Sequence, residues 1–532
     1  MPVPELLVVG TIHTLDPARP RAGAALLRDG RIACVGTEGK CAARAAPGAR
    51  RIELGGGSAI PGLADAHGHV LWLGRAAFEV SCEGSASAEA CAALVAARAA
   101  ATAEGRWIVG RGWDQHRWPG AAFPDAALLS RAAPRHPAFL TRVDGHAAWV
   151  NRLALEAAGI APGTPDPPGG RIGRDAAGRP DGILIDAAMD LVRARLPRPA
   201  PAELEEGLLA GLRAVAALGL TSVHDAGCAP EVLDAYGRLA AADRLPVRVY
   251  AMIDGMVPLP ALEREMSRWR AAPATGLLEI RGVKLYADGA LGSRGAALLE
   301  DYSDDPGNRG LLVSTPEALR EKVLACVRAG FQPAVHAIGD RAVREALLAL
   351  RAAGSAARAL RPRIEHLQVV QPADLPLLAE TGAVASVQPV QAASDGPWAA
   401  ARLGAGSVRL AGAYAFRTLA DSGAVLAFGS DFPVESPDPR AGLHAAETRM
   451  TSEGRPFAVE QAVSRLEALR AFTAGAAYAS FAEGRRGRIA AGLDADLTLF
   501  AEDVLAVAPG ALRRLTVTHA LVAGRVAYER GR

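Results

Sequence analysis

Eight short apolar runs, separated by alanine-rich stretches of helical character, constrain the fold of this 532-residue chain more than any other feature. Strand-like and helix-like segments that alternate in this way are typical of a parallel sheet with crossover helices. The candidate strands are 58–67, 221–227, 247–253, 282–289, 331–340, 363–370, 383–390 and 425–431. An open dinucleotide-binding sheet would need a GxGxxG loop after the first strand, and none follows it. Since eight βα units close into a barrel, we predict an α/β fold of the (β/α)8 TIM type.

The two ends of the chain differ from this middle. Both consist of short β-type runs interrupted by turn residues, such as Asp29-Gly30 and the glycines at 55–57 near the start. We therefore expect residues 1–58 and 485–532 to build one composite β-sandwich domain. The barrel is expected to occupy residues 59–484.

One connection in the barrel is too long for a helix and a loop. It lies between Val70 and Thr221, so residues 76–205 are predicted to be an insertion after barrel strand 1. The insertion contains four of the seven tryptophans in the chain, namely Trp107, Trp113, Trp118 and Trp149. Inserted βα loops lie on the catalytic face of a barrel, so these rings form either a lid and substrate wall or the core of the insertion itself.

Charge and composition exclude several classes of function. The chain has 59 basic and 57 acidic residues, which leaves no charge pattern expected of a protein that binds nucleic acid or an anionic membrane. The start lacks a signal-peptide pattern, and no uncharged apolar run approaches the roughly 18 residues of a membrane span. Six cysteines without a CxxC pair indicate reduced thiols. We expect a cytoplasmic protein with a small-molecule substrate and no nucleic-acid or membrane partner.

Metal-ligating residue types follow the predicted strands. His67 and His69 are two positions apart at the end of the first strand, so both imidazoles can face one point. His336, His366 and Asp431 end the fifth, sixth and eighth strands. Each residue alone could be an ordinary core histidine or a turn aspartate. Because a barrel gathers its strand ends on one rim, the set together predicts a metal site.

Lys284 lies in the fourth strand between two apolar residues, and the chain has only three lysines. A buried ammonium is costly, so its pKa can fall and leave a neutral amine. The alternative is a lysine at a strand end whose amine reaches solvent. As a metal-site residue it would complete a set of six groups, sufficient for two divalent ions. His67, His69 and Asp431 would bind the first ion, His336 and His366 the second, with Lys284 between them.

Several long motifs carry a resemblance to a known family. They are PGLADAHGHV, DGHAAWVN, VKLYADGALGSRGA, HAIGDRAV, IEHLQ, SVQPVQAASD, GSDFPVE and GRIAAGLDADLTLF. On these residues the chain resembles the amidohydrolase superfamily, and within it the amidohydrolase-3 group that includes formamide deformylases and YtcJ-like proteins. The resemblance covers almost the whole chain. It implies a distorted barrel with a composite β-sandwich, zinc as the metal, and a carbamate formed from carbon dioxide on Lys284 that bridges two ions. It also allows a homodimer.

The resemblance implies hydrolysis of a C–N bond in a small amide, formamide or cyclic amide. A metal-bridging hydroxide would attack the carbonyl, and Asp431 would carry the proton to the leaving nitrogen. His146, Arg294, Gln391 and Trp113 are the predicted substrate contacts. His146 and Arg294 could instead serve an internal hydrogen bond and a loop salt bridge. Family members usually carry histidine at the position of Gln391, and an amide cannot carry a proton, although it can orient a polar substrate.

Other readings stay open at this point. A deaminase, or an ester or phosphoester hydrolase, could use the same scaffold. Deaminase relatives usually have one metal and a glutamate near the strand-five histidine, where this chain has Asp340. A non-catalytic assembly protein is a further alternative, but such a protein would be expected to have lost metal ligands, and all six are present.

Overall fold

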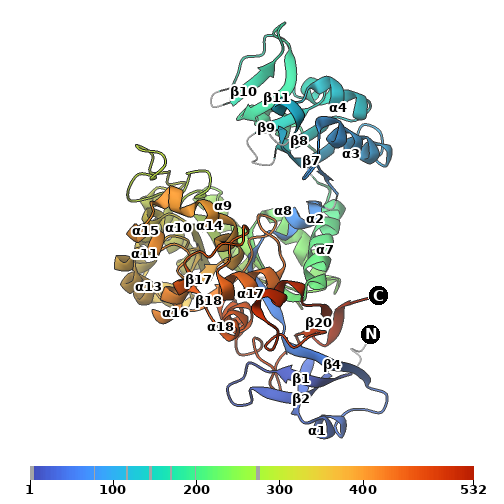
Figure 1. The fold of residues 1–532 in the computed structure, drawn as a ribbon, viewed down its shortest axis with the longest axis vertical. Helices are drawn as coiled ribbons and strands as arrows, with labels where there is room; N and C mark the ends of the chain where they lie inside the picture. The colour runs from blue at the N-terminus through green and yellow to red at the C-terminus, as the bar shows by residue number, and fades with distance from the viewer. Residues whose placement is uncertain are drawn as a thin grey trace. The chain divides into compact units, whose positions relative to one another are not determined.

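The computed structural model describes residues 5–76, 78–115, 118–142, 147–167, 170–197, 199–270 and 276–531. The chain divides into two compact units (Figure 1). One comprises residues 1–71 and 208–532, and the other comprises residues 72–207. The predicted insertion, 76–205, lies inside the second unit. The chain passes between the units within α2 (Val70–Ala76) and α7 (Pro201–Ala217).

The larger unit contains the predicted barrel, and the prediction of its fold class is confirmed. Eight parallel strands follow one another in chain order around it. They are β5 (Leu63–Gly68), β12 (Leu220–Cys228), β13 (Arg248–Asp254), β14 (Leu278–Tyr286), β15 (Gln332–Ala337), β16 (Arg363–His366), β17 (Val384–Val387) and β18 (Leu426–Phe428). The first and last strands meet where Gly68 bridges Phe432. There the Asp431 amide donates to the His67 carbonyl at 2.7 Å.

Helices follow most of these strands and pack on the barrel. They are α8 (Pro230–Ala241), α9 (Leu259–Arg270), α10 (Pro316–Ala329), α11 (Asp340–Ala352), α12 (Gly354–Ala359), α13 (Leu375–Thr381), α14 (Pro389–Leu403), α15 (Val408–Ala411), α16 (Phe416–Asp421), α17 (Pro439–Thr448), α18 (Arg465–Arg470) and α19 (Ala476–Ala479). Local sequence sets their ends. The Thr315 side chain accepts from the Ala318 amide, Pro316 opens α10, and Gly330 ends it at φ 76°.

The two chain ends join in one seven-stranded sheet beside the barrel (Figure 1). Its order is β21 (Arg525–Glu529), β20 (Val517–Val522), β19 (Leu497–Phe500), β4 (Arg50–Pro61), β1 (Leu6–His13), β2 (Arg21–Arg28) and β3 (Arg31–Gly36). The short helix α1 (Glu38–Ala42) packs on β2. Strand β4 joins the ends, because it pairs with β1 on one side and β19 on the other.

The sequence predicted that the apolar run 58–67 forms one barrel strand, and this prediction is wrong. Its first part belongs to β4 in the terminal sheet and its second part to β5 in the barrel. The break falls at Gly62, where an added Cβ would lie 2.2 Å from the Thr221 hydroxyl oxygen. The chain therefore changes sheets at a point where only glycine fits.

The second unit has its own six-stranded sheet and its own core. The strand order is β10 (Gly170–Arg174), β11 (Pro180–Asp186), β9 (Ala147–Val150), β8 (Ala138–Arg142), β7 (Ile108–Trp113) and β6 (Val80–Ser81). Its helices are α3 (Ala88–Ala100), α4 (Ala126–Ala132), α5 (Arg152–Ala157) and α6 (Met189–Arg193).

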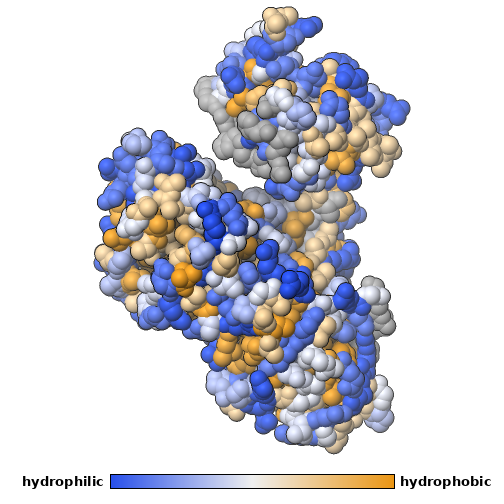
Figure 2. Space-filling model, in the orientation of Figure 1, coloured by the Kyte–Doolittle hydropathy of each residue, from blue (hydrophilic) through white to orange (hydrophobic). Residues whose placement is uncertain are grey.

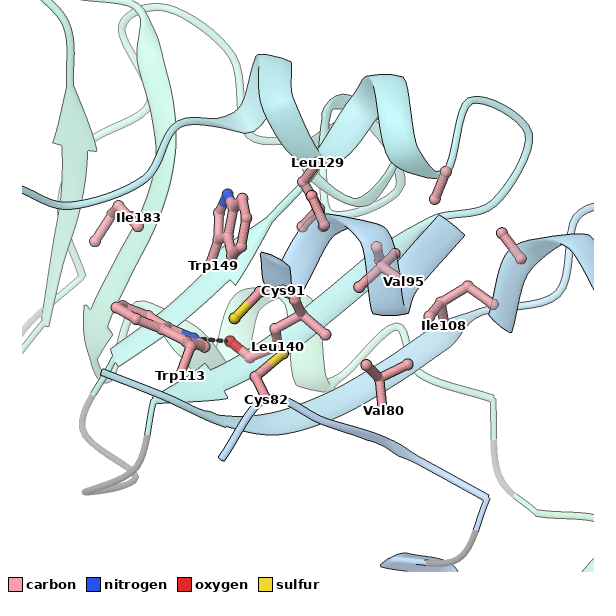
Figure 3. Close-up of a cluster of buried hydrophobic side chains, with 14 of the residues drawn as sticks. Val80, Cys82, Cys91, Val95, Ile108, Trp113, Leu129, Leu140, Trp149 and Ile183 are labelled. Atoms are coloured by element: carbon pink, nitrogen blue, oxygen red, sulfur yellow. Dashed lines mark hydrogen bonds between the residues drawn. The ribbon is translucent and has the colours of Figure 1, made fainter. Parts of the chain in front are cut away.

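Tryptophans form much of this second core. Figure 3 shows Trp113 and Trp149 among aliphatic side chains that include Leu140. Both rings are fully buried, and Trp113 Nε1 donates to the Leu140 carbonyl at 2.8 Å. Trp118 belongs to the same core, whereas Trp107 lines a cavity of about 280 Å³ in this unit. For Trp113, Trp118 and Trp149 the structure therefore agrees with the core alternative.

On the face shown in Figure 2, hydrophilic and hydrophobic residues are interspersed, as is usual for globular proteins. Among the helices in the described part of the chain, none combines the length and the apolar character needed to cross a membrane.

Candidate metal centre

Five of the six predicted metal-site residues lie at or just beyond the carboxyl ends of barrel strands, and Lys284 lies near the end of its own strand. His67 is in β5, and His69 directly follows that strand. His336 and His366 lie at the ends of β15 and β16, and Asp431 follows β18. In a (β/α)8 barrel this rim is where active sites are built.

His67, His69 and Asp431 form a compact group of donor atoms. One ligand atom from each lies within 4.8 Å of the other two. Oδ1 of Asp431 is 3.2 Å from Nε2 of His69 and 3.6 Å from Nε2 of His67. Gly68 permits this approach, because a Cβ there would lie 2.2 Å from the Phe432 ring. The glycine of the HxH motif is therefore required by packing against the segment that follows β18.

Lys284 faces the same group from β14. Its side chain is 1% exposed, and Nζ lies 3.0 Å from Nε2 of His67. Burial lowers the pKa of Lys284 to about 8, although the negative charges of Glu365 and Asp431 oppose the shift. The structure therefore agrees with the expectation that this amine is buried.

His336 and His366 lie side by side near His67. The ring centroids are 4.5 Å apart for His336 and His366, and 4.9 Å apart for His67 and His366. Burial lowers the pKa of His336 to about 3 and that of His366 well below its usual value. Both imidazoles are therefore neutral at physiological pH, as metal ligands must be. Nδ1 of His366 is 2.8 Å from Oε1 of Gln388, which leaves Nε2 available as a ligand atom.

Two of these residues have left-handed backbone conformations. The φ angles are 72° at His366 and 62° at Asp431. Non-glycine residues in this region are strained by about 1–3 kcal/mol and concentrate at functional sites. At His366 the conformation interrupts the alternation of β16, so that Glu365 and His366 can both contact His67, although they are adjacent in sequence.

The structure adds residues that the sequence analysis did not identify. Glu365 Oε2 lies 2.5 Å from Nδ1 of His67, and Arg363 forms an ion pair with Glu365. Asp65 accepts hydrogen bonds from the backbone amides of His67 and Ser430, which joins β5 to the loop after β18. The available signal was the presence of charged residues inside apolar runs, in RIEHLQ and in PGLADAH.

The predicted substrate contacts are distributed differently. Gln391 lies at the centre, where Nε2 donates to Oδ2 of Asp431 at 3.2 Å. Arg294 forms a bidentate ion pair with Asp304, the salt-bridge alternative for this residue. His146 lies outside the described residues. Trp113 lies in the core of the second unit. Its predicted role as a substrate contact stays a prediction.

The donor set fits a divalent cation. Neutral imidazole nitrogens and a carboxylate oxygen are the ligands that zinc-like ions prefer. His67, His69 and Asp431 provide them within one small volume, and Lys284, His336 and His366 adjoin that volume.

Comparison with known proteins gives a consistent result. The profile of the amidohydrolase family matches residues 50–528. YtcJ of Bacillus subtilis (strain 168) is 31% identical over 532 residues, which cover 98% of each chain. An N-substituted formamide deformylase of Arthrobacter pascens is 28% identical, with 99% of this chain and 98% of that protein covered. The crystal structure of an uncharacterized metal-dependent hydrolase from Pyrococcus horikoshii OT3 aligns at a TM-score of 0.81 and 26% identity. That alignment covers 95% of this chain and 99% of the other.

Proposed function

Because the chain belongs to the amidohydrolase family, we propose that it is a metal-dependent hydrolase that cleaves a C–N bond of a small amide, formamide or cyclic amide. The observation that carries the proposal is the convergence of His67, His69 and Asp431 donor atoms beside the buried amine of Lys284. The similarity to a formamide deformylase makes N-substituted formamides the first substrates to test.

Two divalent ions, zinc in our proposal, would be held by two sets of ligands. His67, His69 and Asp431 would hold one ion, and His336 and His366 the other. When bound, such ions polarise a carbonyl and lower the pKa of water, which supplies a nucleophile at neutral pH.

Lys284 would join the two sets as a carbamate. Its neutral amine would attack the carbon of carbon dioxide. One C=O π pair would move onto oxygen as the N–C bond forms, and the nitrogen would release one proton to water, which leaves an anionic pair of oxygen ligands. The lowered pKa of about 8 supports this step. It makes about a tenth of the amine neutral at pH 7, against less than one part in a thousand at the ordinary lysine pKa.

Asp431 would carry the proton during the reaction. Its Oδ1 faces the two histidine nitrogens, and its Oδ2 accepts from the Gln391 amide. A carboxylate in this position can take a proton from water and deliver it to the leaving nitrogen. Gln391 would keep the carboxylate oriented, a task that needs a donor rather than a proton carrier.

The position of Asp340 argues against the deaminase alternative. This aspartate is fully buried, and both of its oxygens accept hydrogen bonds, from the Leu299 amide at 2.9 Å and from Gln371 Nε2 at 2.6 Å. These bonds anchor the start of α11 and occupy the carboxylate. It therefore does not replace the glutamate that deaminase chemistry would need.

The test is a substrate panel with zinc-loaded protein. N-substituted formamides, N-acyl amines and cyclic amides are compared with an aryl ester, a phosphoester and an aminopurine. We expect turnover of at least one amide class, lost in Asp431→Asn and after chelation. Turnover of only the phosphoester or the aminopurine would contradict C–N hydrolysis of amides.

A further inference from the structure

A fully buried carboxylate on β16 contacts the imidazole of His67 on β5. Glu365 is 0% exposed, and its Oε2 lies 2.5 Å from Nδ1 of His67. The opposite ring nitrogen of His67, Nε2, faces Lys284 and Asp431. The two nitrogens of one imidazole therefore serve different purposes, one toward the centre and one toward the carboxylate.

The charge state of Glu365 fixes the direction of this hydrogen bond. Arg363 donates from Nε to Oε1 at 2.7 Å and from Nη2 to Oε2 at 3.1 Å. Two hydrogen bonds from one guanidinium to the two oxygens of one carboxylate are the geometry of an ionised carboxylate. An ionised carboxylate only accepts, so Nδ1 of His67 holds the proton and Nε2 presents its lone pair.

Arg363 in turn is attached to several strands. Its Nη2 donates to the carbonyl of Ala66 at 2.6 Å and to the hydroxyl of Ser386 at 2.8 Å, and Nη1 lies 2.9 Å from Nδ1 of His224. Ala66 directly precedes His67. The guanidinium thus places the carboxylate relative to the same stretch of backbone that carries the imidazole.

We propose that Glu365 is a positioning residue that sets the tautomer and orientation of His67 for metal binding, with Arg363 as its electrostatic support. Outer partners of this kind orient metal-ligating histidines and raise their basicity, and their loss typically weakens metal binding 10- to 100-fold. His366 differs from His67 in this respect, because the partner of its Nδ1 is the uncharged amide of Gln388.

This inference rests on the proposed metal-dependent function, and the experiment separates the two. Zinc affinity of chelator-treated protein is measured by competition with a chromogenic chelator for wild type, Glu365→Gln and Glu365→Ala. The matched controls are Asp496→Asn and Asp496→Ala. Asp496 is another buried carboxylate held by the Nε and Nη2 of an arginine, Arg248, at 2.6 and 3.0 Å, and no histidine of the described residues is hydrogen-bonded to it.

We expect at least tenfold weaker zinc binding in both Glu365 variants and unchanged binding in the Asp496 variants. Histidine-labelled ¹⁵N NMR of the metal-free protein gives the second readout. His67, assigned with His67→Asn, should be protonated on Nδ1 in wild type and in Glu365→Gln, whose amide oxygen still accepts. In Glu365→Ala the Nε2-protonated form should appear.

The outcomes are distinct. Wild-type zinc affinity in both Glu365 variants would overturn the inference, as would equal losses in the Asp496 controls. Failure of wild type to bind zinc would instead contradict the proposed function, and the NMR comparison would still test the hydrogen bond. If Glu365→Ala does not fold, Glu365→Gln alone decides the affinity test.

Discussion

The barrel centre and the core of the second unit bury equally large side chains for opposite purposes. Trp113 and Trp149 in the second unit, and Arg363 and Lys284 in the barrel, are among the largest side chains with less than 2% exposure. The tryptophans bury apolar area and satisfy single indole N–H groups against backbone carbonyls. The cations bury charge against histidines and a carboxylate.

Buried indole rings and buried cations contribute differently to the stability of a fold. Burial of an indole stabilises a fold directly. Burial of a guanidinium or ammonium is unfavourable unless partners compensate it, and replacement of such ion pairs by apolar residues is often neutral or stabilising. The buried charges of Arg363 and Lys284 inside the barrel are therefore better explained by the groups they position than by the stability they add.

The largest predicted effect is a loss of catalytic activity without a loss of folding in either unit. Asp431→Asn keeps the shape of the side chain but removes the anionic ligand and the proton carrier. We expect kcat to fall by about a hundredfold to ten-thousandfold, with the melting temperature unchanged within a few degrees. Hydrolysis assays and thermal unfolding check this. An Asn variant with wild-type turnover would remove Asp431 from the mechanism.

A substitution in the core of the second unit should have the converse effect, with lower stability and unchanged metal binding. Trp149→Ala leaves a cavity in the core of the second unit and removes the hydrogen bond to the Asp125 carbonyl. We expect the free energy of unfolding of that unit to fall by about 3–5 kcal/mol. Urea denaturation followed by tryptophan fluorescence measures the loss. Zinc content per folded chain should stay at the wild-type level, and a parallel loss of metal would show that the two regions are not independent.

The sequence predicted each region only in part. The eight barrel strands followed from apolar runs that alternate with helical stretches. The position of the six candidate metal-site residues near strand ends followed from the same runs, because a barrel gathers strand ends on one rim. Glu365 did not follow. Strict alternation along β16 places Glu365 and His366 on opposite faces, and the left-handed φ at His366 that changes this has no local sequence signal.

The second unit shows the same limit. Tryptophans in an insertion were compatible with a substrate wall or with a core. The strand order around Leu140 places the Trp113 ring in the core of the second unit, a position that the sequence pattern alone does not show. The split of the run 58–67 between two sheets depends on the close approach of Gly62 to Thr221, a tertiary contact that periodicity cannot reveal.

A third prediction compares Glu365, which is paired with Arg363, with Asp395, a carboxylate whose partner is a tyrosine. Tyr414 donates to Asp395 at 2.5 Å, and burial raises the pKa of Asp395 to about 6. A raised folded-state pKa contributes stability at low pH, and the contribution is lost as pH rises from the unfolded value near 4 through about 6. Asp395→Asn should therefore be more stabilising at pH 8 than at pH 4, by about 2 kcal/mol. Urea unfolding at the two pH values checks it, and no difference would contradict the shift.

The smallest predicted effect concerns the orientation of Asp431. Gln391→Ala removes one hydrogen bond to Oδ2, a loss of about 1 kcal/mol. We expect kcat to fall less than tenfold with KM and zinc content nearly unchanged. A large rise in KM would assign Gln391 to substrate binding instead. Gln391→Glu, which places a second negative charge beside Asp431, should be more damaging than Gln391→Ala.

The most direct measurement is metal content by elemental analysis of wild type, Lys284→Ala and Lys322→Ala. Lys322 is a matched control, since its Nζ donates to a backbone carbonyl, that of Gly255. We predict two zinc-like ions per chain in wild type and in Lys322→Ala, and one or none in Lys284→Ala. Substoichiometric metal in wild type that Lys284→Ala leaves unchanged would contradict a binuclear centre built around this lysine.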